Sequence, residues 1–350
     1  MQKDIYKSDY FYELPEDLIA KYPAKDRTSS KLLHLDEKNI HIDQFTSIKD
    51  VLKEGDLLVL NETKVISARL NFKKQTGGNV EILVLKKINK NTANCLTKGL
   101  NKKIKEQILY TDNFPIKISI INDLRDSVEI KFNQAVDDLC CAIGHVPIPP
   151  YLNRQDEELD RDRYQSVFAS DKHINSIAAP TASLHFDKQL IEQIGAKITI
   201  CKISLDIGLG TFKPLSDKLI TNTSKLHKED FFISESASSI LNETIKSNKR
   251  VIALGTTTLR ALESAYDVKS KIIKSGHQST DIFIHEGYNF KVVDSLITNF
   301  HLPESSLLML VSAFGGKENI FNAYKYAIKH KMRFFSYGDA MIIKKCLSKS

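Results

Sequence analysis

The amino-acid sequence predicts an α/β fold in which a large mixed, barrel-like α/β domain is interrupted by a small antiparallel β-barrel domain. Two observations lead to this fold class. Helical and strand-like segments alternate after residue 164, which is typical of α/β sheets. Between residues 61 and 138, short β-rich runs follow one another at roughly 8–12-residue spacing, which is typical of an all-β unit. We expect residues 1–60 and 150–350 to form the large domain and residues 61–149 to form the insert.

The insert is predicted from a succession of strand-like runs separated by glycine and asparagine turn signals. The segment GHVPIPPY at 144–151 follows them, and its prolines exclude a regular helix. It predicts a rigid connector that returns the chain to the large domain. The strand-like runs are VEILVLKKI (80–88), QILYT (107–111), PIKISII (115–121) and SVEIKF (127–132).

The first segment of the large domain, residues 1–60, ends with the strand-like run DLLVL at 56–60. Residues 186–195 predict a helix, because apolar side chains recur at helical spacing until Gly195. Residues 234–248 predict another helix, for which Ser234 is a suitable cap. The other expected elements are strands at 197–208, 250–255, 281–285 and 332–338 and helices at 255–266 and 319–329.

Composition argues against secretion and against insertion in a membrane. The five cysteines are an odd number and show no CxxC spacing, so neither a disulfide framework nor a cysteine-based zinc site is expected. No apolar run approaches the ~18 residues that a membrane span requires. The charged, aromatic start of the chain resembles neither a signal peptide nor a transit peptide. We therefore expect a cytoplasmic protein.

Positive charge is concentrated in the predicted insert. The net charge is +7, and seven lysines without any acidic residue lie between Lys86 and Lys105. Two interpretations stay open at this point. The lysines form either a solvated face or a patch that neutralises the phosphates of a nucleic acid.

Polar side chains follow three of the predicted strands, at Asp206, at Thr256 and Thr257, and at Asp339. Ligands of α/β sheets bind at the carboxyl ends of strands, so the three positions together predict a site, although each alone is more typical of a helix cap. Arg260 lies one turn into the helix after the threonines. There it suits a carboxylate or a phosphate, or is a surface arginine beside a capped helix.

Three histidines lie in loops flanked by proline with few charged neighbours: His145, His185 and His301. Each is either a hydrogen-bonded structural residue or a group that transfers protons near neutral pH. The segment GLGTF at 208–212 lacks the third glycine of a dinucleotide-binding turn. Its glycines instead predict that a ring or a sugar approaches the backbone closely.

Long and unusual motifs then identify a family. They include ELPEDLIAKYP, GDLLVLNETKVISARL, GHVPIPPYLNR, SIAAPTASLHF, GLGTFKPL, GTTTLR, VVDSLITNFHLPESSLLMLVSAFGG and RFFSYGDAMII. With these segments, which run nearly from end to end, the chain resembles the S-adenosylmethionine:tRNA ribosyltransferase-isomerase family of queuosine biosynthesis. Many members carry His where this chain has Asp206, so a role for Asp206 leans towards holding a ribose hydroxyl or a cation.

The resemblance implies an enzyme that uses S-adenosylmethionine as a substrate. Its ribosyl part is transferred, with isomerisation, to 7-aminomethyl-7-deazaguanine (preQ1) at the wobble position of tRNA. The product is epoxyqueuosine-tRNA, and adenine and methionine leave. The resemblance also implies that no metal or other cofactor is needed and that the protein is a monomer.

Within this resemblance we expect His185 to be the base that removes a proton beside the sulfonium, with His301 and His145 as the next choices. Asp339 or a second histidine is expected to donate to the departing adenine. The residues expected to bind substrate are Thr181, Asp206, Gly208, Gly210, Thr211, Thr256, Thr257, Arg260 and Asn299. Those expected to contact tRNA are Lys64, Arg69, Lys102, Lys103 and Lys105.

Two other functions compete with this interpretation. An RNA methyltransferase would share both substrates but would release S-adenosylhomocysteine, and the sequence lacks the early glycine-rich strand–turn–helix usually used to hold that cofactor. A non-enzymatic RNA-binding module would use the basic insert but would leave the histidine- and glycine-containing loops without a role.

Overall fold

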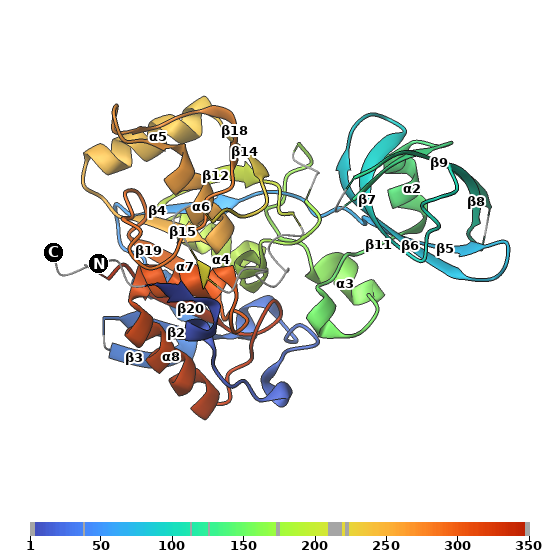
Figure 1. Ribbon diagram of the computed structural model, residues 1–350. Coiled ribbons are helices and arrows are strands. Elements are labelled where there is room, and N and C mark those ends of the chain that lie inside the picture. The colour runs from blue at the N-terminus through green and yellow to red at the C-terminus, as the bar shows by residue number, and fades with distance from the viewer. Residues whose placement is uncertain are drawn as a thin grey trace.

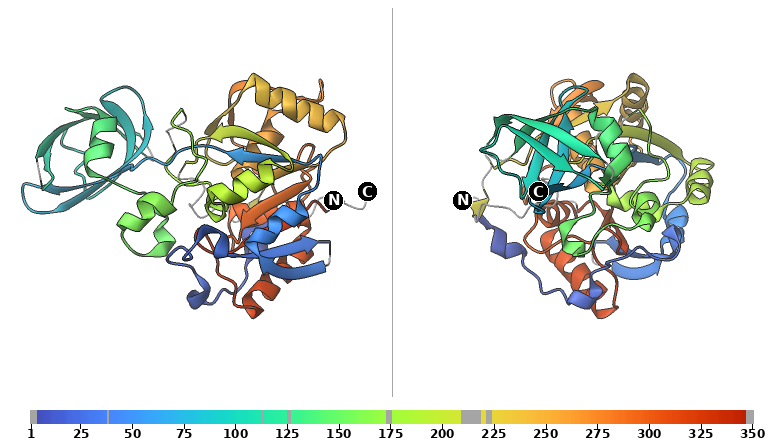
Figure 2. Two further views of the ribbon diagram at one scale, coloured as in Figure 1. Left: turned by 180° about the vertical axis from the view of Figure 1, so that it is seen from behind. Right: turned by 90° about the vertical axis from the view of Figure 1, so that its right-hand side faces the viewer.

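The computed structural model describes residues 4–37, 39–112, 114–124, 127–172, 176–208, 219–220 and 224–346. Figure 1 shows a larger α/β part and a smaller, mainly β part beside it, and the two further views in Figure 2 show the same separation. Each part has its own hydrophobic interior, and the interior of the large part is divided between the two faces of its sheet.

The large part is built on one mixed sheet. Its four central strands are mutually parallel, and three of them are buried along their whole length, which requires helices on both faces. The strand order is β18 (Gly276–Thr280), β14 (Glu229–Ile233), β12 (Thr199–Leu205), β4 (Leu57–Asn61), β15 (Val251–Leu254), β19 (Ser295–Asn299), β20 (Ala340–Lys344), β2 (Lys31–Asp36) and β3 (Asn39–Gln44).

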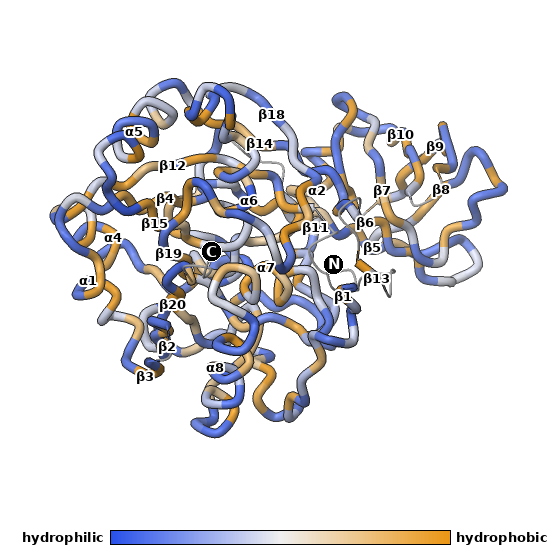
Figure 3. The backbone as a smooth tube through the Cα atoms, turned by 60° about the vertical axis from the view of Figure 1, so that its left-hand side comes forward, coloured by the Kyte–Doolittle hydropathy of each residue, from blue (hydrophilic) through white to orange (hydrophobic). Residues whose placement is uncertain are grey.

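Successive side chains of the central strands point to opposite faces of the sheet and pack into two cores, one on each face. Leu57 and Val59 of β4 belong to one core, whereas Leu58 and Leu60 belong to the other. The apolar colour along β12 and β4 in Figure 3 follows this burial. The first core is covered by α5 (Glu235–Lys246), α6 (Thr256–Ala265), α7 (Ser306–Gly315) and α8 (Lys317–Lys329), the second by α1 (Ile48–Val51) and α4 (Lys188–Gly195).

Helix starts follow the local sequence. The Ser234 hydroxyl accepts from the N–H of Ala237 and caps α5, as predicted, and the Asp187 carboxylate caps α4 by accepting from Leu190. The remaining regular elements are α2 (Val136–Ile143), α3 (Glu158–Arg163), β1 (Ile5–Tyr6), β13 (Leu219–Ile220), β16 (Tyr266–Asp267) and β17 (Ile272–Ile273).

The insert is a closed six-stranded antiparallel barrel, which confirms the prediction for this part of the fold class. Its strands follow the order β5 (Arg69–Lys74), β6 (Asn79–Lys87), β7 (Thr92–Lys98), β10 (Val128–Phe132), β9 (Pro115–Asp123) and β8 (Glu106–Tyr110), and β8 pairs again with β5. Helix α2 packs on the barrel core, and β11 (Gly144–His145) pairs with the start of β5 where the chain leaves the barrel.

The structure confirms a mixed α/β domain with an inserted barrel, but two details differ from the predictions. Among the described strands the large sheet has two edges, β18 and β3, instead of the expected barrel-like closure. Residues 281–285 and 332–338 form no ladder strands, although Phe283, Ile284 and Phe334 are buried. An apolar run indicates that a segment is buried, but not that it pairs with another strand. In this part of the sheet the paired strands are β19 and β20.

No helix in the described ranges is long and apolar enough to cross a membrane.

Candidate active site

A pocket opens beside the carboxyl ends of the parallel strands β15 and β19. Because parallel strands end at the same edge of a sheet, residues that are distant in the chain meet there. The lining residues come from the segments after β12, β15 and β19, from residues 179–182, from Tyr151 and from the loop before β20. They are Tyr151, Ala179, Pro180, Thr181, Ala182, Ile207, Gly255, Thr256, Thr257, Thr298, Asn299, Phe300, His301, Leu302, Ser305, Leu307, Phe335 and Ser336, and we call this the strand-end pocket.

The first turn of α6 lies in the wall of the strand-end pocket and has no side-chain cap. Gly255 precedes it with a φ of 91°, a conformation that favours glycine. The Thr257 hydroxyl is buried and has no hydrogen-bond partner, whereas the Thr258 hydroxyl donates to the Leu254 carbonyl. An uncapped helix start with a free buried hydroxyl suits an anionic group of a ligand.

His301 lies in the same wall, and its backbone is held from both sides. The Tyr12 hydroxyl donates to the His301 carbonyl over 2.6 Å, and the His301 N–H donates to the Tyr324 oxygen over 2.9 Å. On the ring, Nε2 lies 3.0 Å from Oγ1 of Thr298, while Nδ1 makes no hydrogen bond to any residue that the structure describes. Burial lowers the pKa of the imidazole to about 3, so the ring is neutral.

His185 is buried between two hydrogen-bond partners. Its Nδ1 lies 2.8 Å from Oγ of Ser30, and its Nε2 lies 3.1 Å from Nδ2 of Asn299. The same Asn299 nitrogen donates to the Phe335 carbonyl, so it is a donor and His185 Nε2 accepts. Burial, and secondarily the positive charge of Arg333, lowers the pKa of His185 to about 3. Both ring nitrogens of this neutral histidine are therefore occupied.

A second, smaller pocket is lined by His185, and Ser336 lines both pockets. Its wall brings together three arginines from three separate segments. The lining residues are Pro23, Ala24, Arg27, Ser30, Arg163, Leu184, His185, Arg333, Ser336, Tyr337 and Gly338, and we call this the arginine pocket. These arginines and Ser30 were not predicted from the sequence, since no local motif marks residues that meet only through long-range packing.

Asp339 is placed as a structural carboxylate. Its Oδ1 accepts from the N–H of Lys31 over 2.9 Å, and its Oδ2 accepts from the N–H of Arg333 over 2.7 Å. These bonds fix the loop before β20 against β2. Asp339 itself is in neither pocket wall.

Arg260 forms a buried ion pair and does not line either pocket. Its Nη1 lies 2.5 Å from Oε2 of Glu229, and each side chain is only 3% exposed. The other carboxylate oxygen of Glu229 accepts from the N–H of Gly208 over 3.2 Å. Arg260 thus acts on the start of the glycine-containing loop through Glu229, instead of presenting a free guanidinium to the pocket.

The remaining predicted substrate residues are distributed as follows. Oδ1 of Asp206 accepts from the Thr63 hydroxyl over 3.2 Å, and the next residue, Ile207, lines the strand-end pocket. Thr181, Thr256, Thr257 and Asn299 line that pocket directly. Gly210 and Thr211 lie outside the described residues.

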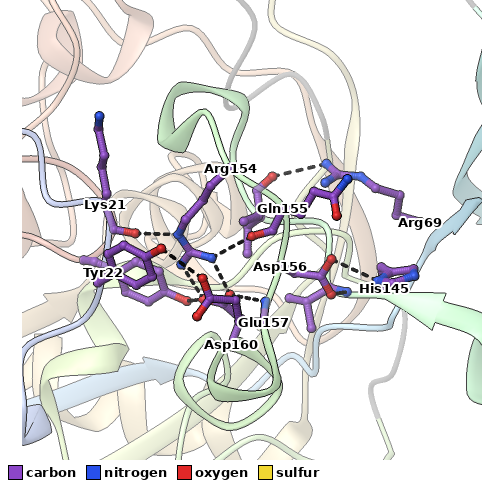
Figure 4. A network of polar contacts seen from close by, with 12 residues as sticks. Lys21, Tyr22, Arg69, His145, Arg154, Gln155, Asp156, Glu157 and Asp160 are labelled. Atoms are coloured by element: carbon purple, nitrogen blue, oxygen red, sulfur yellow. Dashed lines mark hydrogen bonds and ion pairs between the residues drawn. The ribbon is translucent and has the colours of Figure 1, made fainter.

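His145 lies at the base of the barrel and in neither pocket wall. Its Nδ1 is 3.0 Å from Oδ1 of Asp156, and Figure 4 shows this pair within the network that joins the connector to Lys21 and Tyr22. Arg154 is the centre of the network, because it contacts Asp160 with both terminal nitrogens and the Lys21 carbonyl with Nε. His145 therefore fixes the connector.

The predicted tRNA-contacting residues lie on and near the barrel. Arg69 donates to the Ile148 carbonyl, Lys64 pairs with Asp171, and Lys102 pairs with Asp123. Lys103 and Lys105 are exposed in the loop between β7 and β8.

Among the described residues one cluster has ligand atoms close enough for a metal ion, namely His34, His41 and Asp43. It lies on β2 and the edge strand β3 and belongs to neither pocket wall.

A sequence model described as queuosine biosynthesis protein matches residues 7–343, which include both the large sheet and the barrel. The chain belongs to this family. The motif-based resemblance is therefore confirmed, and it extends over both parts of the fold.

Relatives within the queuosine biosynthesis family are similar over almost their full length. The S-adenosylmethionine:tRNA ribosyltransferase-isomerase of Acinetobacter baumannii is 47% identical over 345 residues, covering 97% of this chain and 98% of the relative. That of a Sulfurihydrogenibium species is 47% identical over 341 residues, covering 96% and 99%. The crystal structure of the S-adenosylmethionine tRNA ribosyltransferase of Thermotoga maritima is 31% identical, covers 96% of this chain and 100% of that chain, and gives a TM-score of 0.53.

Proposed function

We propose that this chain transfers the ribosyl part of S-adenosylmethionine, with isomerisation, onto preQ1 at the wobble position of tRNA, giving epoxyqueuosine-tRNA and releasing adenine and methionine. Its family and the names of its relatives support this activity. The observation that carries the chemistry is the strand-end pocket, where a neutral histidine with one free ring nitrogen lies in the same wall as an uncapped helix start.

The methionine carboxylate of the substrate binds at the start of α6. The free backbone N–H groups of the first turn form the positive end of the helix dipole, which attracts an anion. The buried Thr257 hydroxyl, without a partner in the protein, gains one from the carboxylate. Arg260 supports this arrangement indirectly through Glu229 and Gly208.

His301 removes the proton beside the sulfonium. A carbon next to a positively charged sulfur is acidified, and the base must be neutral before it accepts the proton. His301 meets this condition and keeps Nδ1 available, whereas the acceptor nitrogen of His185 is occupied by Asn299. His185 is then a positioning residue that orients Asn299. The imidazolium formed at His301 donates its proton to a ring nitrogen of the departing adenine, so the proton is conserved between the two steps.

The direct test incubates the protein with adenine-labelled S-adenosylmethionine and tRNA that carries preQ1, followed by chromatography of the small molecules. We expect free adenine and methionine in equal amounts, together with epoxyqueuosine in the tRNA. Formation of S-adenosylhomocysteine would assign an RNA methyltransferase instead. Binding of tRNA without consumption of S-adenosylmethionine would assign an RNA-binding module.

The proposal includes a cytoplasmic monomer that works without a metal ion. None of the steps above uses a group outside the side chains named and the substrates. Adenine release should therefore persist in excess chelator and remain proportional to protein concentration. Loss of activity with chelator, restored by one divalent metal, would contradict this part.

A further inference from the structure

The arginine pocket has a wall that is strongly cationic for its size. Arg27 comes from the N-terminal segment, Arg163 from the end of α3, and Arg333 from the loop before β20. None of its described lining residues carries a carboxylate. Three guanidinium groups around one hollow, each offering several N–H donors, suit an oxyanion with several acceptor oxygens.

Two of the arginines are held mainly by neutral acceptors. Arg163 donates to the carbonyls of Lys25 (2.9 Å) and Ala24 (2.8 Å), and its buried Nε has no partner. Arg27 donates to the carbonyls of Gln165 (2.9 Å) and Asp162 (2.7 Å). Backbone carbonyls orient a guanidinium without cancelling its charge.

Carboxylates near the pocket only partly balance these charges. The Asp162 carboxylate lies 3.5 Å from Nη2 of Arg27 but is 81% exposed, so water screens the pair. The Asp339 carboxylate lies 3.9 Å from Nε of Arg333 and already accepts two backbone N–H groups. Asp160 is engaged by Arg154 and by the Tyr337 hydroxyl. The pocket therefore keeps a net positive field.

The two pockets are neighbours that share a wall. Ser336 lines both, and the hydrogen bond from Asn299 to His185 joins the strand-end pocket to the arginine pocket. A ligand that fills the first pocket thus has an anion-binding hollow close beside it. In a nucleotide, the group attached next to the base and sugar is a phosphate.

From these contacts we infer that the arginine pocket binds a backbone phosphate of the RNA next to the nucleotide that enters the strand-end pocket. This inference rests on the proposed function, since it takes RNA as the substrate. It assigns to Arg27, Arg163 and Arg333 a role in holding RNA that is separate from the lysines of the barrel.

The test measures binding of a preQ1-containing anticodon stem-loop RNA to the full chain, without S-adenosylmethionine. Arg333→Gln is the main variant, because its side chain makes only a long contact of 3.5 Å to the Tyr22 carbonyl and a 3.9 Å approach to Asp339. Arg161→Gln is the matched control. It also removes one guanidinium charge, but Arg161 lies on α3, is exposed and is outside the pocket wall. We expect roughly tenfold weaker RNA binding for Arg333→Gln and little change for the control.

A second arm identifies the anion. RNAs with a neutral methylphosphonate at single positions beside the wobble nucleotide should bind the unaltered protein about tenfold more weakly at one position. At that position the methylphosphonate should not further weaken RNA binding by Arg333→Gln, because this variant already lacks the contact between the arginine and the phosphate. Additive losses at every position tested would overturn the inference. So would weaker equilibrium binding of S-adenosylmethionine to Arg333→Gln with unchanged RNA affinity, which would assign the pocket to the methionine carboxylate.

Arg333→Lys and thermal unfolding guard against a folding defect. A folded Arg333→Lys variant keeps the positive charge but lacks the planar guanidinium that donates two parallel hydrogen bonds. It should bind RNA with intermediate affinity. If Arg333→Gln is unfolded, Arg333→Lys with the methylphosphonate series decides alone, and binding equal to that of the unaltered protein overturns the inference. Because turnover is not measured, failure of the proposed chemistry would appear separately, as absence of adenine release.

Discussion

Nδ2 of Asn299 lies 3.1 Å from Nε2 of His185 and also donates to the Phe335 carbonyl, so one amide group spans the wall between the two pockets. The amide oxygen of Asn299 is buried and has no partner in the protein. A buried acceptor left without a donor costs free energy unless a ligand provides one. We therefore expect Asn299 to contact the substrate and His185 to orient Asn299.

The first prediction separates a catalytic base from a positioning residue. His301→Ala should lower the rate of adenine release at saturating substrates by about 10²–10⁴-fold, because His301 is the one histidine among the described residues that line the strand-end pocket. Added imidazole should restore part of that rate, since it can occupy the vacated space. His185→Ala should lower the rate less, and imidazole should not restore it. Rescue of His185→Ala but not of His301→Ala would reverse the two assignments.

The second prediction concerns stability against pH. Both pocket histidines have pKa values lowered to about 3 by burial, whereas their unfolded pKa is near 6.5. Below pH 6.5 the unfolded chain takes up protons that the folded chain refuses, so stability falls as the pH decreases towards 3. Each histidine contributes a slope of about 1.4 kcal/mol per pH unit in that range. Urea unfolding between pH 6.5 and 4.5 should therefore show a free energy of unfolding that falls with decreasing pH. In His301→Gln the slope of this free energy against pH should be smaller by the contribution of one histidine. An unchanged slope would show that His301 is protonated in the folded protein.

A third prediction uses the unpaired hydroxyl at the start of α6. Thr257→Val keeps the shape of the side chain and removes a buried polar atom that has no partner. The free energy of unfolding should stay equal or rise slightly, because an unsatisfied group is lost. The KM for S-adenosylmethionine should rise about tenfold if that hydroxyl binds the substrate. Steady-state kinetics with Thr258→Val as the comparison tests this, since the Thr258 hydroxyl already donates to Leu254. Equal KM values for both variants and the unaltered protein would exclude the contact.

The fourth prediction concerns the buried pair of Arg260 and Glu229. Either Arg260→Met or Glu229→Gln alone should cost about 3–5 kcal/mol of stability, because the remaining charge or polar group stays buried without its partner. The double variant should cost clearly less than the sum of the two single changes. Urea unfolding of all four proteins gives the coupling free energy. The exposed pair of Lys225 and Asp281 is the control, and its coupling should not exceed ~1 kcal/mol. Strict additivity at Arg260 and Glu229 would show that the pair is not energetically coupled.

The last prediction addresses the lysines of the barrel. Replacing Lys102, Lys103 and Lys105 together by glutamine should weaken binding of full-length tRNA and make it less dependent on salt. All three are exposed, so stability should change little. Anisotropy titrations at several salt concentrations measure both quantities. Unchanged affinity and slope would remove this loop from the RNA-binding surface.

Local patterns predicted much of the fold. Ser234 caps α5 as expected, and the β-rich runs between 80 and 132 form the barrel. The patterns were misleading at 281–285 and 332–338, where buried apolar residues belong to loops. Local sequence reports which side chains avoid water, but a partner strand elsewhere in the chain decides whether the backbone forms a ladder.

In the candidate site, too, the sequence predicted several of the residues that line the pocket, but long-range packing decided which of the candidates are available to a ligand. Thr256, Thr257, Asn299 and His301 were expected at strand ends or in a loop, and they line one pocket. Arg260 of α6 was expected to hold an anion, yet its partner is Glu229 of β14. His145 was a candidate base, yet it pairs with Asp156 at the base of the barrel.

Sequence alone therefore determined the family, the class of fold and the residue types capable of acid–base and anion chemistry, because these depend on long motifs and on local periodicity. Only the tertiary structure decided which of those groups are free. Hydrogen-bond partners such as Ser30 and Asn299 for His185, or the carbonyls that hold Arg163, come from segments more than one hundred residues away. Their effect on charge and pKa exists only after long-range packing has excluded water from the contacts between them.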